Sequence, residues 1–259
     1  MPVTDDLSLL IAAAQDAGKI AARYFHGFAD RWDKPGGLGP VTEADLAVDQ
    51  MLREELTAAR PNYGWLSEET EDGAERLKAE HVFIVDPIDG TRSFIEGSTT
   101  WAHSLAVARR GRVEAAVVYL PLRDKLYAAA RDKGATLNGK SLAVSPRRDL
   151  EGATVLAAKP NFTPSRWINA TVPPITRAFR SSLAYRLSLV GEGRFDAMMT
   201  LHPTWEWDVA AGSLIVEEAG GTVSDPARRP ARFNNPVPQL SGMVAGATAI
   251  HDALLTHLA

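Results

Sequence analysis

Apolar residues recur at three- and four-residue steps over the first 28 positions of the chain. This spacing predicts an amphipathic helix that packs one face against a core. The positions are Leu7, Leu10, Ile11, Ala14, Ala17, Ala21, Phe25 and Phe28. The glycine- and proline-rich segment 33–40 then predicts a loop. A second helix is predicted to begin at Thr42, with Asp45 three positions later as in a capping box.

Shorter apolar segments, separated by glycines or charged turns, follow from residue 81. The segment His81 to Asp86 predicts a strand, and the segments between Trp101 and Gly134 predict an antiparallel meander. The pair Asn138-Gly139 is typical of a tight turn between strands. The middle of the chain is therefore expected to be a sheet of short antiparallel strands.

The pattern changes near Gly152, after which strands and helices alternate. Strands are predicted over 153–159, 194–200 and 242–247, and helices over 182–190, 207–221 and 249–258. The pair Gly220-Gly221 is expected to end the second of these helices. The chain has no internal repeat and no long linker. These patterns predict a layered α/β (α+β) arrangement of two tightly joined subdomains, residues 1–148 and 149–259.

Composition narrows the function classes. The 259 residues are 45% hydrophobic, and 28 Lys and Arg against 32 Asp and Glu give a net charge of -4, which does not suggest a nucleic-acid polymer as partner. Cysteine is absent, which excludes thiolate chemistry and agrees with a reducing cytoplasm. The first residues do not resemble a signal peptide, and no run reaches the ~20 apolar residues of a membrane span. A cytoplasmic protein that binds no membrane is therefore expected.

The segment "VDPIDGT", residues 85–91, places two carboxylates in the turn after an apolar strand. Asp86 and Asp89 repel each other and lose hydration at such a position, and a cation would remove the conflict. Carboxylates together with the Ile88 carbonyl form the oxygen-only ligand set that Mg²⁺ prefers. Gly90 and Thr91 offer amides for an anion if they begin a helix. An ordinary acidic turn capped by Asp89 stays the alternative.

Three further acids could join this turn. Glu68 or Glu69, after "YGWL", could project from a strand end into the same cleft, although a glutamate pair is usually a solvated loop. Asp45 on its own is better explained as a helix-start acid favoured by the helix dipole. Asp208 lies among tryptophans and small apolar residues, so it predicts a buried charge that needs a partner, either a cation or Arg186.

These motifs carry a resemblance that covers nearly the whole chain. "VDPIDGTRSF" and "WDVAAGSLIVEEAGG", supported by "VTEAD" and "LSEET" in the expected order, are similar to the signatures of the inositol monophosphatase superfamily. Its members are Mg²⁺-dependent, lithium-sensitive phosphomonoesterases. The resemblance implies an alternating αβαβα sandwich with the site between its layers, two or three Mg²⁺ ions, and a homodimer.

The resemblance also assigns metal ligands, residue by residue. It implies that Glu68, Asp86 and the Ile88 carbonyl hold a first Mg²⁺. Asp86, Asp89 and Asp208 would hold a second, and a third, weaker metal would share Glu68. The acids of four distant segments would thus meet around the ions.

The remaining site residues are assigned in the same way. The resemblance implies that the Gly90 and Thr91 amides bind phosphate, and that Asp45 and the Thr91 hydroxyl orient a metal-bound water for attack. Glu69 would lie behind the metal ligands. Lys34 falls in a segment that resembles a mobile flap beside the metals.

The substrate is predicted less sharply than the chemistry. Inositol phosphatases have a glutamate seven positions before the last metal aspartate, and this chain has Leu201 there. The segments around residues 180–208 look more similar to bacterial 3'(2'),5'-bisphosphate nucleotidases, which would place Ser181, Ser182, Arg186 and Glu206 in the leaving-group pocket. A bisphosphate nucleotidase is therefore ranked first. An inositol-1-monophosphatase or a histidinol-phosphate phosphatase is the alternative.

Other classes of protein fit less well. A catalytically silent metal-binding or interaction protein of the same fold stays open until phosphate release is tested. The chain lacks the Gly-x-Ser-x-Gly elbow of many serine hydrolases and the Gly-x-Gly-x-x-Gly loop of nicotinamide enzymes. Its six histidines show no His-Glu-x-x-His pairing, which argues against zinc hydrolysis. The sequence therefore predicts a phosphatase of small phosphorylated metabolites.

Overall fold

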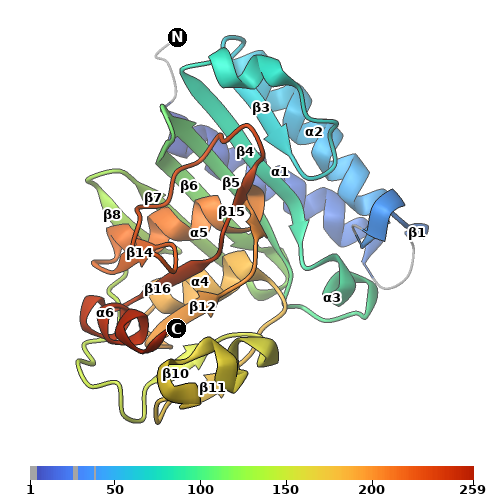
Figure 1. Cartoon of the computed structure of the whole chain (residues 1–259). Helices are drawn as coiled ribbons and strands as arrows, with labels where there is room; N and C mark the ends of the chain where they lie inside the picture. The colour runs from blue at the N-terminus through green and yellow to red at the C-terminus, as the bar shows by residue number, and fades with distance from the viewer. Residues whose placement is uncertain (1–4, 26–28, 38) are drawn as a thin grey trace.

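Two helices form the first layer of the fold in the computed structural model, which describes residues 5–25, 29–37 and 39–259 (Figure 1). The first is α1 (Asp6–Tyr24), which buries a stripe of small and aliphatic residues. It is shorter than predicted because the chain turns extended at Phe25; Phe28 lies outside the described residues. The second is α2 (Glu43–Ala59), and its predicted capping box between Thr42 and Asp45 is confirmed.

A seven-stranded sheet packs against these two helices. Its strands, in spatial order, are β3 (Gly64–Ser67), β4 (His81–Asp89), β5 (Ala102–Arg109), β6 (Arg112–Leu120), β7 (Lys125–Ala130), β8 (Gly134–Leu137) and β9 (Lys140–Ser141). The pair β3 and β4 is parallel, and every later pair is antiparallel. The predicted meander is therefore confirmed. So is the turn at Asn138 and Gly139, where both residues have positive φ.

The helices α4 (Leu183–Gly191) and α5 (Glu206–Glu218) form the middle layer. They contact each other closely because Gly212 has no side chain, and a Cβ there would lie 2.5 Å from the Cβ of Leu187. One face of α5 lies on the seven-stranded sheet, and α4 reaches the second sheet. The helix α5 ends two residues before the predicted glycine pair, with Gly220 at φ 86°.

A five-stranded sheet and one helix complete the layers. The strands, in spatial order, are β11 (Thr176–Ala178), β10 (Thr154–Leu156), β12 (Ala197–Thr200), β16 (Met243–Gly246) and β14 (Thr222–Ser224). The helix α6 (Thr248–His257) packs on its outer face through Ile250 and Leu254. The predicted strand 153–159 is shorter because a 3₁₀ turn begins at Lys159. The strand predicted over 194–200 begins only at Ala197.

Short elements connect these layers. The hairpin of β1 (Arg31–Asp33) and β2 (Pro40–Thr42) precedes α2, and a pair of two-residue strands, β13 (Thr204–Trp205) and β15 (Gln239–Leu240), flanks the start of α5. The short helix α3 (Thr91–Ile95) follows β4. A helix beginning at Gly90 and Thr91 was considered as a condition for anion binding, and α3 begins there. The other short elements were not predicted, since each is too short for its periodicity to be read from the sequence.

The five layers alternate as helices, sheet, helices, sheet and helix, so the predicted αβαβα sandwich is confirmed. Three apolar clusters fill the spaces between them. The division into subdomains near residue 148 stays a prediction, although the two sheets use residues 64–141 and 154–246. Among the described residues, none of the helices combines the length and apolar character needed to cross a bilayer.

Candidate active site

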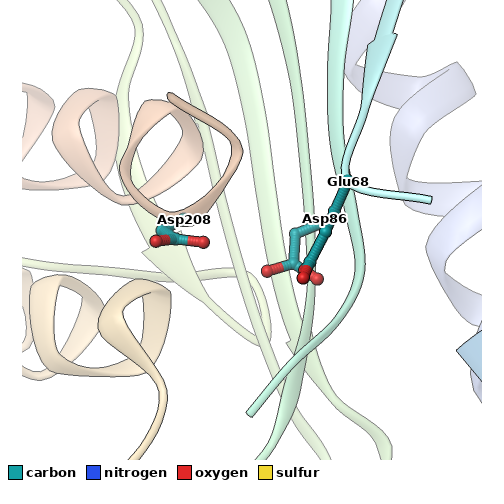
Figure 2. A group of neighbouring side chains, drawn as sticks. All are labelled: Glu68, Asp86 and Asp208. Atoms are coloured by element: carbon teal, nitrogen blue, oxygen red, sulfur yellow. The ribbon is translucent and has the colours of Figure 1, made fainter. Parts of the chain in front are cut away.

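Three carboxylates from three separate segments meet between the seven-stranded sheet and α5. Glu68 follows β3, Asp86 lies in β4, and Asp208 lies in the first turn of α5 (Figure 2). Each offers an oxygen atom, and these three atoms lie within 4.8 Å of one another. The parallel register that pairs Ser67 with Val85 brings Glu68 beside Asp86. Sequence reasoning named all three acids, and the fold brings them together.

The electrostatics of this acid cluster are unbalanced. Asp86 is 1% exposed, and its Oδ1 has no hydrogen-bond partner among the described residues. Burial first, and then the charges of Glu68 and Asp89, raise the pKa of Asp86 well above its ordinary value. Burial and the charge of Asp89 do the same for Asp208. A cation bound among these oxygens would relieve both the desolvation and the repulsion.

A lysine of the chain reaches one side of the acid cluster. The Nζ of Lys34 lies 2.7 Å from an oxygen of Glu68 and 2.7 Å from an oxygen of Glu69. Burial opposes the charge on Lys34, yet the two glutamates hold its pKa above the ordinary value. Burial and Glu68 raise the pKa of Glu69 to about 7 against the effect of Lys34. The segment predicted as a flap therefore contacts the site through its lysine.

Asp89 is not among the three acids whose oxygen atoms lie within 4.8 Å of one another, although its charge raises the pKa of Asp86 and Asp208. Its Oδ2 accepts hydrogen bonds from the Ser182 hydroxyl, at 2.6 Å, and from the backbone N–H of Ala184, at 2.7 Å. Burial raises the pKa of Asp89 to about 6, and these hydrogen bonds oppose the rise. One oxygen of Asp89 is thus bound to the start of α4. Its assignment as a metal ligand stays a prediction.

Asp45 and Thr91 form a hydrogen-bonded pair on the α2 side of the turn. The Thr91 hydroxyl lies 3.1 Å from Asp45 Oδ1 and 3.2 Å from the Ile88 carbonyl oxygen. Asp45 Oδ2 accepts from the Thr42 backbone N–H and hydroxyl. Burial raises the pKa of Asp45 to about 6, although these bonds oppose the rise. Asp45 therefore both caps α2 and fixes Thr91.

Gly90 joins β4 to α3 with a backbone that only glycine adopts freely. Its φ is 103°, and it is the residue before the first turn of α3. A Cβ at this position would lie 3.5 Å from Trp101. The sharp turn sets the Gly90 and Thr91 amides beside the aspartates, and their binding of phosphate stays a prediction.

The four residues predicted for a leaving-group pocket have varied partners. Ser182 caps α4 by accepting from Tyr185 N–H, in addition to its bond to Asp89. The Ser181 hydroxyl accepts from Ser93 at 2.7 Å and donates to the Thr100 carbonyl at 3.1 Å. Ser182 is completely buried, and contact with substrate stays a prediction for both serines.

Arg186 and Glu206 are tied to the protein itself. The Arg186 guanidinium donates to the carbonyls of Arg180 and Ser181 and lies 4.5 Å from the ring centre of Phe179. The fully buried Glu206 accepts from Asn234 N–H, and from Asn235 N–H and its side-chain amide. The fold does not bring Glu206 to the acid cluster.

Sequence reasoning missed one residue beside the turn. His103 in β5 is fully buried, and its Nδ1 hydrogen-bonds to the Pro87 carbonyl oxygen. A histidine within the apolar stretch 101–108 was the available signal. It was considered only as a zinc ligand, because its contact with Pro87 depends on the pairing of β4 and β5.

The comparisons with known proteins assign this layered fold and its acid cluster to the phosphatases, which hydrolyse phosphate esters. The chain belongs to the inositol monophosphatase family, whose model matches residues 4–259. It is 36% identical to an inositol-1-monophosphatase of Rhizobium meliloti, over 85% of each chain. It is 34% identical to the Nus factor SuhB of Escherichia coli K12, over 85% of this chain and 84% of that one.

Solved structures agree with the family assignment. An IMPase of Thermotoga maritima superposes with a TM-score of 0.82 at 28% identity, over 98% of this chain and 96% of that one. The extragenic suppressor protein suhB of Bartonella henselae gives a TM-score of 0.80 at 30% identity, over 96% of each. The predicted family and its fold are thus confirmed.

Proposed function

We propose that the protein hydrolyses a small phosphomonoester with the help of Mg²⁺, and that inositol 1-phosphate is the first substrate to test. The observation that carries the proposal is the convergence of Glu68, Asp86 and Asp208 within 4.8 Å. Phosphomonoester hydrolysis depends mainly on positioning and on charge stabilisation, and a cluster of acids that holds divalent ions provides both.

The residues at the cluster fit Mg²⁺. Its donors are hard oxygens, the Asp86 Oδ1 has no partner among the described residues, and a Lys34 ammonium already binds Glu68. Glu68, Asp86 and the Ile88 carbonyl would hold one ion, and Asp86, Asp89 and Asp208 another. A third would share Glu68. When bound, Mg²⁺ lowers the pKa of water and offsets the charge of the phosphoryl group.

Asp45 and Thr91 are proposed to orient the attacking water. At neutral pH Asp45 is mostly ionised, because its raised pKa is about 6. Its Oδ1 can then accept the Thr91 hydroxyl proton, so that an oxygen lone pair of that hydroxyl is free to accept a hydrogen bond from the attacking water, with the ionised Asp45 as the final acceptor of the proton. The Gly90 and Thr91 amides would bind the phosphate, and Glu69 would hold Lys34 beside the cluster.

The preferred ester is the finer part of the proposal. The sequence ranked a bisphosphate nucleotidase first, but the relatives named above support the alternative, an inositol-1-monophosphatase. Glu206, which the nucleotidase resemblance put in the pocket, has its carboxylate occupied by Asn234 and Asn235. Leu201 in place of the inositol-contacting glutamate keeps histidinol phosphate and adenosine 3',5'-bisphosphate in the comparison.

A phosphate-release assay tests the proposal. Purified protein is given inositol 1-phosphate, adenosine 3',5'-bisphosphate or histidinol phosphate, with Mg²⁺ or with EDTA, and with or without Li⁺. We expect release only with Mg²⁺, inhibition by Li⁺, and the highest kcat/KM for inositol 1-phosphate. A higher kcat/KM for the bisphosphate would favour a bisphosphate nucleotidase over an inositol-1-monophosphatase. If no ester gives Mg²⁺-dependent phosphate release, the alternative of a catalytically silent metal-binding protein is favoured.

Two further expectations belong to the same proposal. A homodimer is expected from the family, and sedimentation equilibrium of the purified protein checks it. A cytoplasmic location is supported by the absence of cysteine. Cell fractionation with an antibody to the chain would test the location.

A further inference from the structure

His103 lies beside the turn that carries the aspartates, yet it is not one of the acids or their predicted helpers. A carbonyl oxygen only accepts hydrogen bonds, so the Nδ1 that contacts Pro87 must carry the proton. The Nε2 is then an acceptor, and it is buried without a partner among the described residues. Burying such a nitrogen without a partner destabilises the folded state. The presence of a histidine at this buried position therefore requires an explanation.

The contact falls on an irregular part of the sheet. In the pairing of β4 with β5, Asp86 lies opposite Ser104 and Asp89 lies opposite Ala102, so β4 has one residue too many. Pro87 and Ile88 have no register partner in β5. A bulge of this kind bends the strand and redirects its side chains. His103 stands between the two paired residues of β5 and binds the bulged segment with its side chain.

The imidazole is held in one orientation by its neighbours. The Trp101 ring lies edge-on to it at 5.4 Å between centroids, and the Tyr119 ring lies at 6.3 Å on the neighbouring strand. Tyr119 in turn packs against Gly18 of α1, where a Cβ would come within 2.7 Å of its ring. The first helix layer therefore packs against Tyr119, and Tyr119 lies beside the imidazole that binds the Pro87 carbonyl.

Two successive carbonyls of the turn thus lie against different side chains. The Pro87 carbonyl accepts from His103, and the Thr91 hydroxyl lies within hydrogen-bond distance of the Ile88 carbonyl. Rotation of either peptide would move the ligand atoms on both sides of it, because the carboxylates of Asp86 and Asp89 flank the pair. A fixed turn keeps these oxygens aimed at one space before any ion arrives.

We propose that His103 is a positioning residue for the metal ligands of the turn, in that its Nδ1–H fixes the Pro87 carbonyl and so sets the direction of Asp86, Ile88 and Asp89. This inference rests on the proposed function only in requiring that the turn binds a divalent cation. A packing role alone predicts something different: any apolar side chain of similar size would then serve as well.

The test compares two substitutions by Mn²⁺ binding, measured by electron paramagnetic resonance, and by thermal unfolding in EDTA. His103→Leu removes the donor and keeps apolar volume. His103→Asn places an amide N–H near the position of Nδ1. We expect His103→Leu to weaken Mn²⁺ binding about 10- to 100-fold, as for other residues that orient ligands. We expect it to keep its melting temperature in EDTA, because the unpartnered nitrogen is gone. His103→Asn should recover most of the affinity.

Val107→Ala is the matched control, since Val107 is fully buried on the same face of β5 and far along the strand from the turn. It should lose stability and keep the Mn²⁺ affinity. If His103→Leu does not fold, His103→Gln gives the same contrast with His103→Asn, because its amide lies one methylene further out and should bind Mn²⁺ more weakly.

Equal Mn²⁺ affinity in the unmodified protein and in His103→Leu would overturn this inference and leave the proposed function intact. So would a His103→Asn variant as weak as His103→Leu. An unmodified protein that binds no Mn²⁺ would overturn the proposed function and this inference together.

Discussion

Two kinds of buried carboxylate occur in the same molecule. Glu206 accepts three N–H donors from Asn234 and Asn235, at 2.6–2.9 Å, and Asp196 accepts from the Ser145 hydroxyl at 2.6 Å and from Thr154 N–H at 2.7 Å. Asp86 is buried as deeply, and its Oδ1 has no donor among the described residues. Glu206 and Asp196 thus have several donors each, whereas one buried oxygen of Asp86 has none among the described residues.

The pKa directions follow this difference for Asp196 and Asp86 but not for Glu206. Burial raises the pKa of Glu206, although the hydrogen bonds from Asn235 and Asn234 oppose the rise. For Asp196, hydrogen bonds from Ser145 and Thr154 outweigh the effect of burial and lower the pKa. For Asp86, burial and neighbouring acids act in the same direction and raise the pKa far above its ordinary value. A buried acid with complete partners is therefore evidence of structure, and one surrounded by other acids is evidence of a site for a cation.

Neutralising Asp86 tests this difference with the largest expected effect. Asp86→Asn should lower Mg²⁺-dependent phosphate release by more than about 100-fold, since even residues that only orient ligands are worth 10- to 100-fold. It should also raise the melting temperature in EDTA, because one of the mutually repelling charges is removed. Asp225→Asn is the control, since Asp225 binds Arg229 and lies outside the cluster. Loss of both activity and stability in Asp86→Asn would show that Asp86 has a structural role like that of Glu206 and Asp196.

Substitution of Glu206 should have the opposite effect, a loss of stability without a change in substrate binding. In Glu206→Gln an amide N–H must face an N–H of Asn234 or Asn235, so we expect a loss of about 1–3 kcal/mol in the free energy of unfolding, with KM unchanged. Urea unfolding and kinetics of the folded enzyme measure these quantities. Glu151→Gln, at an exposed position, should stay within about 0.5 kcal/mol. Full stability with a raised KM would show instead that Glu206 contacts substrate.

The pH dependence of stability tests the buried acids near the cluster without mutation. The pKa of Asp45 and of Asp89 is raised to about 6 and that of Glu69 to about 7, so these groups bind protons more tightly in the folded protein than in the unfolded chain. In EDTA the stability that they contribute is full below about pH 4 and is lost as the pH rises through about 6 to 7.

Mg²⁺ competes with these protons, so the rise in melting temperature that it causes should grow between about pH 5.5 and about pH 7.5. Thermal unfolding in EDTA and in Mg²⁺ at both pH values measures it, with Asp86→Asn as the control that should show little Mg²⁺ effect at either. If the rise in melting temperature caused by Mg²⁺ becomes smaller at higher pH, the proposal that Mg²⁺ binds in competition with these protons is wrong.

Much of this picture could be predicted from the sequence, because its causes are local. The apolar stripe of α1, the meander from β5 to β8 and the capping box at Thr42 each depend on residues a few positions apart. The acids at 68, 86 and 208 were named from motifs, and the fold brings them together.

The rest depended on contacts that no local pattern encodes. Ser182 binds Asp89 across 93 positions, and Asn234 binds Glu206 across 28. The nucleotidase resemblance assigned Glu206 to a pocket, which stays a prediction, and nothing near it in the sequence reveals its donors. His103 escaped notice for the same reason, because a bulge between two strands decides its partner.

Substitution of Lys34 is the test with the smallest expected effect. Its ammonium binds Glu68 and Glu69 at 2.7 Å each and is 12% exposed, so it supplies part of the positive charge that the cluster lacks. Lys34→Met should lower the free energy of unfolding in EDTA by about 1 kcal/mol, a value between those of exposed and buried ion pairs. It should tighten Mn²⁺ binding about fivefold, because Glu68 no longer exchanges a lysine for the metal. Calorimetric titration and urea unfolding measure the two effects.

Lys34→Arg keeps the charge and should behave like the unmodified protein in both measurements. Lys19→Met removes an exposed ion pair with Asp16 and should change neither by more than about 0.5 kcal/mol. If Lys34→Met is as stable as the unmodified protein in EDTA and binds Mn²⁺ no more tightly, the lysine does not compete for the cluster. The acids then tolerate their mutual repulsion without the charge of Lys34, and the contrast with Glu206 would depend on Asp86 and Asp208 alone.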